Sequence, residues 1–227
     1  MALIIQSNSF LSNYQVLPSN NDPRIIAGLF VNAVEVQGHA PKLLRTDCGT
    51  ENGIAAAAQA FFHQDENSHA YGKSVSNQRI EVFWSKLRPV LDGWIHHFKT
   101  MQHANLFQPG NQAHIYSMRI AFAKQISDIL KSYLVYWNTH TIRQSADAPG
   151  GIPDTLFYLC SDHYGATVDQ HALALAKESC TFNTTVTGDQ DIDDYFEWIF
   201  ERFQLVPPTD KQSATDLFMS LVARVEM

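Results

Sequence analysis

The 227-residue chain has little cysteine, no long apolar run and fewer basic than acidic residues. Its three cysteines, Cys48, Cys160 and Cys180, are widely spaced and match neither a zinc pattern nor a disulfide framework, which indicates a reducing, intracellular environment. No apolar stretch approaches the roughly 20 residues of a membrane-spanning helix, and residues 2–5 lack the basic lead-in of a signal peptide. We therefore expect one soluble globular protein without a membrane partner.

The formal net charge of −7 disfavours a protein that handles DNA, but the charges are unevenly distributed. Residues 73–146 hold nine lysines and arginines against three acids, whereas residues 147–227 hold four against fourteen. A basic middle segment allows a face that contacts phosphates on an otherwise acidic protein. A solvated basic surface without a partner explains the same counts equally well, so both interpretations stay open.

Two acidic motifs carry most of the functional information. In the segment Leu43–Gly53, a short apolar strand ends at Asp47 and a helix opener follows. The carboxylate is thus predicted at the C-terminal end of a strand, where sites of α/β proteins commonly lie. The segment Ser76–Trp84 contains the second acid, Glu81, with 33 residues between the two.

Glu81 is predicted on the solvent face of a helix. Apolar residues recur at helical spacing and form a core-facing stripe: Ile80, Phe83, Trp84 and Leu87. The opposite face carries Asn77, Glu81, Ser85 and Arg88. A rigid element that points a carboxylate away from the core suits a metal ligand, although an ordinary exposed helix glutamate would look the same in isolation.

Together these motifs resemble the catalytic core of retroviral-type integrases and of transposon-derived proteins built from it. The resemblance covers roughly residues 10–205 and is weaker at His140–Ser145 and Gly151–Phe157. It implies an α/β fold, an RNase H-like mixed sheet flanked by helices, with a mainly helical C-terminal extension. It also implies phosphodiester transfer with two Mg²⁺ ions held by two aspartates and one glutamate. By this resemblance Asp47 is the second catalytic and metal-binding acid, and Glu81 is the third.

The family's first aspartate has no counterpart in this sequence. Upstream of Asp47 the only acids are Asp22, which is expected to cap a helix that begins at Pro23, and Glu35, near the end of that helix. The counterpart of the opening strand, residues 2–5, carries no carboxylate. Either the strand that bears the acid is missing from this N-terminus, or this copy has lost the residue.

The missing acid leads us to expect weak or absent Mg²⁺ binding and an inactive chain. The alternative is a non-catalytic derivative, domesticated or truncated, that serves as a nucleic-acid-binding or protein-interaction domain or has no function. Glu51 could replace the missing ligand, but an acid in the first turn of a helix, favoured by the helix dipole, is the preferred interpretation.

The resemblance further implies DNA as the partner, with a possible homo-oligomer and a nuclear location. Basic residues around Glu81 are the candidate DNA contacts: Lys73, Arg79, Lys86 and Arg88. In the family, basic residues one and two turns after the catalytic glutamate approach DNA. Arg88 keeps the second of these positions, whereas Ser85 occupies the first.

We predict three parts: a partial integrase core with a degenerate or missing opening strand at residues 1–108, the long helix and tail of the core at 109–160, and an acidic helical extension at 161–227. The predicted elements are strands at 2–5, 10–17 and 42–46, helices at 23–36, 54–62, 112–139 and 215–225, and a polar loop at 63–76. The acidic run 189–194 is interpreted as a helix N-terminus, because it lacks the Gly and Glu of a calcium loop. The histidines show no metal-ligand spacing and are expected at the surface: His63, His69, His96, His97, His103 and His114.

Overall fold

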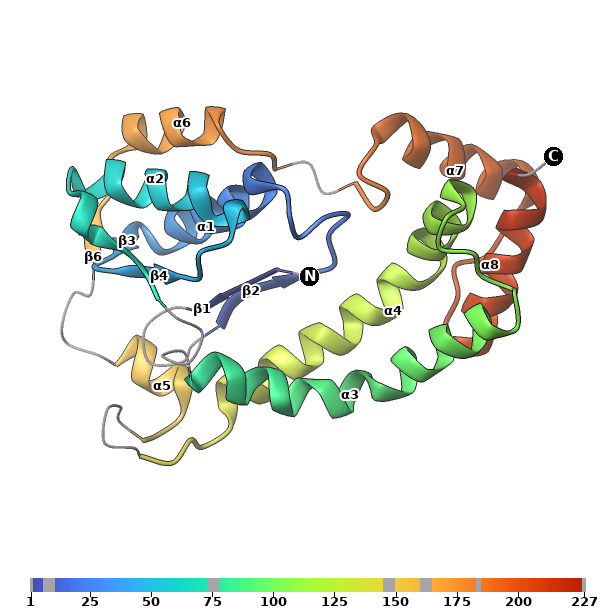
Figure 1. Ribbon diagram of the computed structural model, residues 1–227, viewed down its shortest axis with the longest axis horizontal. Coiled ribbons are helices and arrows are strands. Elements are labelled where there is room, and N and C mark those ends of the chain that lie inside the picture. The colour runs from blue at the N-terminus through green and yellow to red at the C-terminus, as the bar shows by residue number, and fades with distance from the viewer. Residues whose placement is uncertain are drawn as a thin grey trace. The chain divides into compact units, whose positions relative to one another are not determined.

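The computed structural model describes residues 2–5, 11–72, 78–144, 150–159, 165–182 and 185–225, which are mostly helical with small sheets (Figure 1). The helices are α1 (Pro23–Gln37), α2 (Gly53–His63), α3 (Gln78–His103), α4 (Gln112–Thr139), α5 (Pro153–Tyr158), α6 (Gln170–Glu178), α7 (Gln190–Phe203) and α8 (Lys211–Val225). The strands are β1 (Ala2–Ile5), β2 (Leu11–Gln15), β3 (His39–Pro41), β4 (Leu44–Thr46), β5 (His69–Tyr71) and β6 (Gly165–Thr167).

The chain divides into two compact units. The first unit comprises Met1–Gln15, Ser19–Val82 and Ser132–Asn183, and the second comprises Val16–Pro18, Phe83–Lys131 and Thr184–Met227. Both long helices, α3 and α4, contribute residues to both units. The division at residues 108 and 160 that the sequence suggested stays a prediction.

The strands of the first unit form separate pairs. Within the described residues β1 pairs with β2 and β3 with β6, both antiparallel, while β4 pairs with β5 in parallel. The strands expected at 2–5 and 10–17 are present as β1 and β2. The mixed α/β character is confirmed, but a continuous RNase H-like sheet is not formed by these residues. Four of the six strands are only three residues long, and Pro41 in β3 has no N–H to offer a further neighbour.

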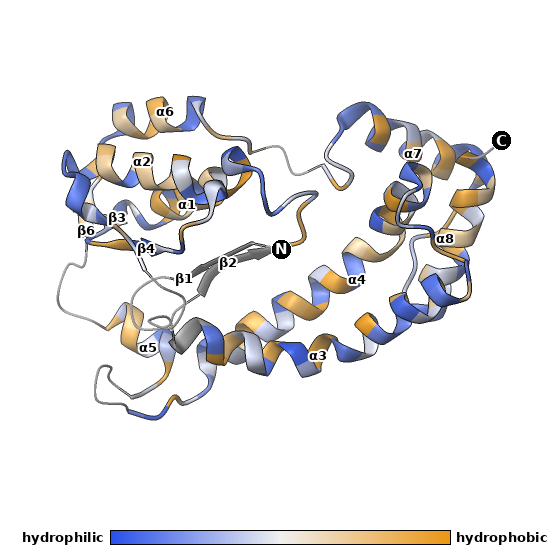
Figure 2. Cartoon of the chain, in the orientation of Figure 1, coloured by the Kyte–Doolittle hydropathy of each residue, from blue (hydrophilic) through white to orange (hydrophobic). Residues whose placement is uncertain are grey.

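The core of the first unit lies between helices α1, α2 and α6, which Figure 1 shows on one side of β3 and β4. Asp22 caps α1 as predicted, because its Oδ1 accepts the N–H of Arg24 at 2.8 Å, and Gly38 ends the helix at φ 75°. The buried residues come from four elements: Ala27, Phe30, Val31, Val34, Ala40, Ala55, Ala58 and Leu173. Figure 2 shows the apolar character of α1 and α2. The helices predicted at 23–36 and 54–62 are thus confirmed.

One glycine of α1 is needed for close packing. A Cβ at Gly28 would collide with the carbonyl oxygen of Thr181, which belongs to the segment after α6. The N–H of Thr181 donates to the carbonyl of Arg24 at 3.1 Å, so this segment lies directly on α1. A larger side chain at residue 28 would push the two backbones apart.

The second unit is built from helices. Its core joins α3, α4, α7 and α8: Met101, Ala121, Phe122, Phe196, Ile199, Ala214, Leu217, Phe218, Leu221 and Val222. The acidic run opens α7 as predicted, because Asp189 accepts the N–H groups of Asp191 and Ile192. The last helix begins at Lys211, earlier than expected, since Asp210 accepts the N–H of Ser213 at 2.8 Å. Hydrogen bonds from Ser213 lower the pKa of Asp210.

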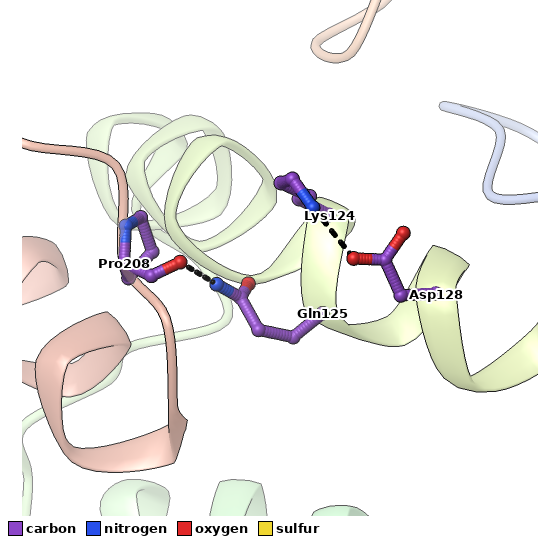
Figure 3. Close-up of polar contacts among 4 residues, drawn as sticks. All are labelled: Lys124, Gln125, Asp128 and Pro208. Atoms are coloured by element: carbon purple, nitrogen blue, oxygen red, sulfur yellow. Dashed lines mark hydrogen bonds and ion pairs between the residues drawn. The ribbon is translucent and has the colours of Figure 1, made fainter.

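The buried face of α4 differs from the predicted stripe. Of the apolar residues at helical spacing, three are buried (Phe122, Tyr133 and Trp137), whereas four are only half-buried (Ile115, Met118, Ile126 and Ile129). Four polar residues of α4 are also buried: His114, Ser117, Gln125 and Asn138. The reason is tertiary, since the Nε2 of Gln125 donates to the carbonyl of Pro208 at 2.8 Å, while Lys124 and Asp128 form an exposed ion pair (Figure 3).

The expectation that the histidines lie at the surface is wrong for His114. This side chain is 5% exposed, and its ring lies 5.9 Å from that of Phe218. His97 is half-buried; its Nε2 lies 3.0 Å from the Thr215 hydroxyl. Burial and the nearby Lys211 lower the pKa of His97.

Candidate active site

Asp47 lies at the C-terminal end of a strand, as the sequence predicted. It follows the last residue of β4 and is exposed. Asn52, at the start of α2, donates from its Nδ2 to the Oδ1 of Asp47 at 2.7 Å. This contact orients one oxygen of the carboxylate and leaves the other available for a ligand. The Asn52 side chain therefore does not cap α2.

The segment that supports β4 was missed by the sequence interpretation. Residues 63–76 were predicted to form a loop, but Glu66–Ser68 form a 3₁₀ turn and His69–Tyr71 form β5. The strand pairs in parallel with β4, and the N–H of Gly72 donates to the carbonyl of Thr46 at 2.8 Å. A strand of three residues is too short to produce a detectable apolar alternation, which explains the error.

His69 on β5 adds a side-chain contact to this pair. Its Nε2 lies 3.0 Å from the hydroxyl oxygen of Thr46, the residue before Asp47. Burial lowers the pKa of His69, which favours the neutral ring. The two strands that support Asp47 are thus joined through side chains as well as backbone.

Gln59 on α2 holds the segment before β5 in place. It is fully buried, and its Nε2 donates to the carbonyl oxygens of Pro41 at 2.5 Å and Ser68 at 3.2 Å. The hydroxyl of Ser68 in turn donates to the carbonyl of Gln59 at 3.3 Å. In the sequence Gln59 is only a polar residue within an apolar helix, which does not indicate this role.

Gln59→Leu is expected to lower the free energy of unfolding by about 1–2 kcal/mol, because the buried Ser68 carbonyl loses this donor and the Pro41 carbonyl keeps only its contact with His63. The expected loss of stability is small because the substitution also removes the Oε1 atom of Gln59, which is buried and has no hydrogen-bond partner among the described residues. Urea denaturation would measure the change, with the exposed Gln170→Leu as the control. Equal stability of the two variants would show that Gln59 does not hold this segment.

Glu81 lies in the first turn of α3 and is exposed. Phe83 and Leu87 are each 1% exposed and Trp84 is half-buried, whereas Ser85 and Arg88 are exposed. The predicted separation of faces is therefore confirmed for these residues. The side chain of Ile80 lies outside the described part.

The candidate DNA contacts are only partly described. Lys86 and Arg88 are exposed on α3. Arg79 belongs to the first turn of the same helix, but its side chain is outside the described part. Lys73 lies in the segment 73–77, which is also outside it.

The described residues contain no cluster of three histidine, cysteine, aspartate or glutamate side chains able to hold a metal ion. Asp47 and Glu81 both belong to the first unit, and their approach to one another stays a prediction. Glu51 lies in the 3₁₀ turn Thr50–Asn52, with its carboxylate beside Gly49. This position agrees with an acid at a helix start.

A family model described as integrase core domain matches residues 5–158, a range that contains both Asp47 and Glu81. The chain belongs to the integrase core domain family. No curated protein and no solved structure matches it. The matched range contains the elements from β2 to α5, whereas β6, α6, α7 and α8 follow it. None of the described helices is both long and apolar enough to cross a membrane.

Proposed function

We propose that this chain is an integrase-core protein that binds DNA and, as these 227 residues stand, does not complete strand transfer. The observation that supports membership in this functional class is the family match together with Asp47 at the end of β4. In this proposal the separate pairs β1–β2 and β4–β5 correspond to strands of the family's RNase H-like sheet, and Glu81 on α3 faces Asp47.

The carboxylates of Asp47 and Glu81 fit a single Mg²⁺ ion better than a pair of ions. Carboxylate oxygens are the hard ligands that Mg²⁺ prefers, and water molecules commonly complete its octahedral shell. Asp47 offers one oxygen beside the atom that Asn52 already contacts, and Glu81 offers an exposed carboxylate. When bound, the metal would stabilise charge on a phosphodiester.

A pair of ions requires a ligand that both share. Residues 1–21 contain no aspartate or glutamate, so β1 and β2 carry no carboxylate. By resemblance to the family, the bridging aspartate belongs on this part of the sheet. We propose that its absence leaves a weak single-metal site and an inactive chain.

The alternative function is a non-catalytic derivative that acts as a nucleic-acid-binding or protein-interaction domain. The first version and the nucleic-acid-binding form of the alternative retain DNA as a partner, and Mg²⁺, a possible homo-oligomer and a nuclear location are family expectations. The excess of basic residues in the segment 73–146 supports DNA contact. Lys86 and Arg88 are the exposed members of the candidate surface on α3.

Charge reversal with Lys86→Glu and Arg88→Glu is expected to weaken binding of duplex DNA and to flatten its salt dependence. For every phosphate that the variant no longer neutralises, the slope of log K against log salt should fall by about 0.9. Fluorescence anisotropy of a labelled duplex over a salt series would give both quantities.

The matched control is Lys124→Glu with Lys131→Glu, an equal charge change at exposed positions of α4. If the control flattens the slope equally, the effect reflects net charge and the α3 surface is not a specific contact. Absence of any DNA binding by the unaltered chain would contradict the proposed function itself.

A further inference from the structure

A groove runs beside α7 in the second unit, and all of its lining residues except Ile120 lie beyond the range of the integrase match. The cavity has a volume of about 390 Å³, within the usual range for ligand pockets. Its lining combines apolar and acidic residues: Ile120, Val186, Asp193, Phe196, Glu197, Phe200 and Glu201. The groove thus combines apolar and negatively charged side chains.

Hydrogen bonds hold the segment that contains Val186 and Thr187 against α7. The carboxylate of Asp193 accepts the N–H of Val186 at 2.7 Å and the N–H of Thr187 at 3.0 Å. The guanidinium of Arg119 donates to the carbonyls of Thr187 and Pro18. Because the carboxylate of Asp193 is occupied by these two backbone N–H groups, the negative charge available to a ligand comes from other residues.

Glu197 and Glu201 supply that charge. They lie one helical turn apart, are both exposed, and form no ion pair with any other residue in the described part of the chain. Helix α7 itself holds five acids, Asp191, Asp193, Asp194, Glu197 and Glu201, against one basic residue, Arg202. Phosphate would therefore be repelled from this face, whereas a cationic ligand would be attracted.

An aromatic pair lies on the same helix. The rings of Tyr195 and Trp198 are stacked with centroids 6.0 Å apart, and the residues are 40% and 53% exposed. Helical spacing places Glu201 between the groove and Trp198 around the axis of α7. Exposed aromatic faces beside carboxylates suit lysine or arginine, because a cation is attracted both to the ring and to the acid.

We propose that this surface docks a short segment of a partner protein that carries lysine or arginine around an apolar anchor. The anchor enters the groove against Phe196 and Phe200. Basic side chains of the segment lie along Glu197 and Glu201, and one of them packs over Trp198. The carboxylates of Glu197 and Glu201 and the apolar lining of the groove together favour a basic peptide over DNA.

The probe is a short fluorescent peptide in which lysines flank a single leucine, measured by anisotropy against the full chain. Glu197→Gln with Glu201→Gln is expected to weaken its binding about five- to tenfold, since both carboxylate charges that attract the lysines are removed. Trp198→Ala should weaken it about threefold to fivefold. Hydrogen exchange on peptide addition should slow within residues 186–201.

The matched control is Glu178→Gln with Asp216→Asn, which removes two exposed charges elsewhere and should change binding less than about twofold. If this control weakens peptide binding equally, the effect of the Glu197 and Glu201 substitutions reflects unspecific charge attraction. Equal binding of a peptide with glycine in place of leucine would exclude the apolar anchor. Absence of peptide binding, or stronger binding of duplex DNA that the same α7 variants weaken, would overturn the proposal.

Discussion

Phe218→Ala is expected to lower the free energy of unfolding by about 3–5 kcal/mol, the range for a fully buried aromatic side chain. Phe218 is 0% exposed on α8, and its ring lies 6.3 Å from Phe107 and 6.4 Å from Phe122. The substitution would leave a cavity where α3, α4, α7 and α8 meet. Because a domain is typically stable by only about 5–15 kcal/mol, this change should remove a large part of the total.

Chemical denaturation followed by circular dichroism would measure the loss. Met219→Ala is the control, since Met219 is the next residue of α8 and is 40% exposed. Its substitution should change stability by about 0.5 kcal/mol or less. A decrease below about 1 kcal/mol for Phe218→Ala would show that these helices do not share one tightly packed core.

Strand transfer and Mg²⁺-dependent nicking by the unaltered chain are expected to be at background. Loss of one electrostatic donor to a developing charge typically costs about 10²–10³ in rate, and loss of a bridging metal ligand should cost at least as much. Asp47→Asn and Glu81→Gln should therefore change nothing measurable. A supercoiled-plasmid nicking assay with Mg²⁺ and with excess chelator would test both variants.

Robust nicking that requires Mg²⁺ and disappears in either variant would contradict this prediction. In that case another group would have replaced the bridging acid, and Glu51→Gln would be the first variant to examine. The control is Glu66→Gln, since Glu66 is an exposed acid in the turn before β5. Nicking that survives Asp47→Asn, Glu81→Gln and Glu51→Gln would point to a contaminating nuclease.

The sequence predicted well those elements whose signals are local. Asp22 and Pro23 defined the start of α1 through a cap and a fixed φ, and the structure shows Gly38 as its left-handed C-cap. The predicted helix at 112–139 coincides with α4. The 3₁₀ turn and β5 were missed, because strands this short are defined by partners distant in sequence.

Side-chain environments were harder to predict. The apolar stripe on α4 gave the wrong buried face in part, since Gln125 is buried by its bond to Pro208, 83 residues further along the chain. His114 is buried against aromatic rings for the same kind of reason. Gln59 could be found only when the carbonyls of Pro41 and Ser68 were located.

The sequence by itself determined the family: the motifs around Asp47 and Glu81 indicated it, and a family match over residues 5–158 confirmed the family. It also determined the helix boundaries that caps and periodicity encode. Only the tertiary structure decided that β5 supports the strand before Asp47, that Asn52 contacts its carboxylate, and that α7 borders a groove. Motifs and caps depend on neighbours along the chain, whereas strand pairs, buried polar contacts and grooves depend on residues that folding brings together.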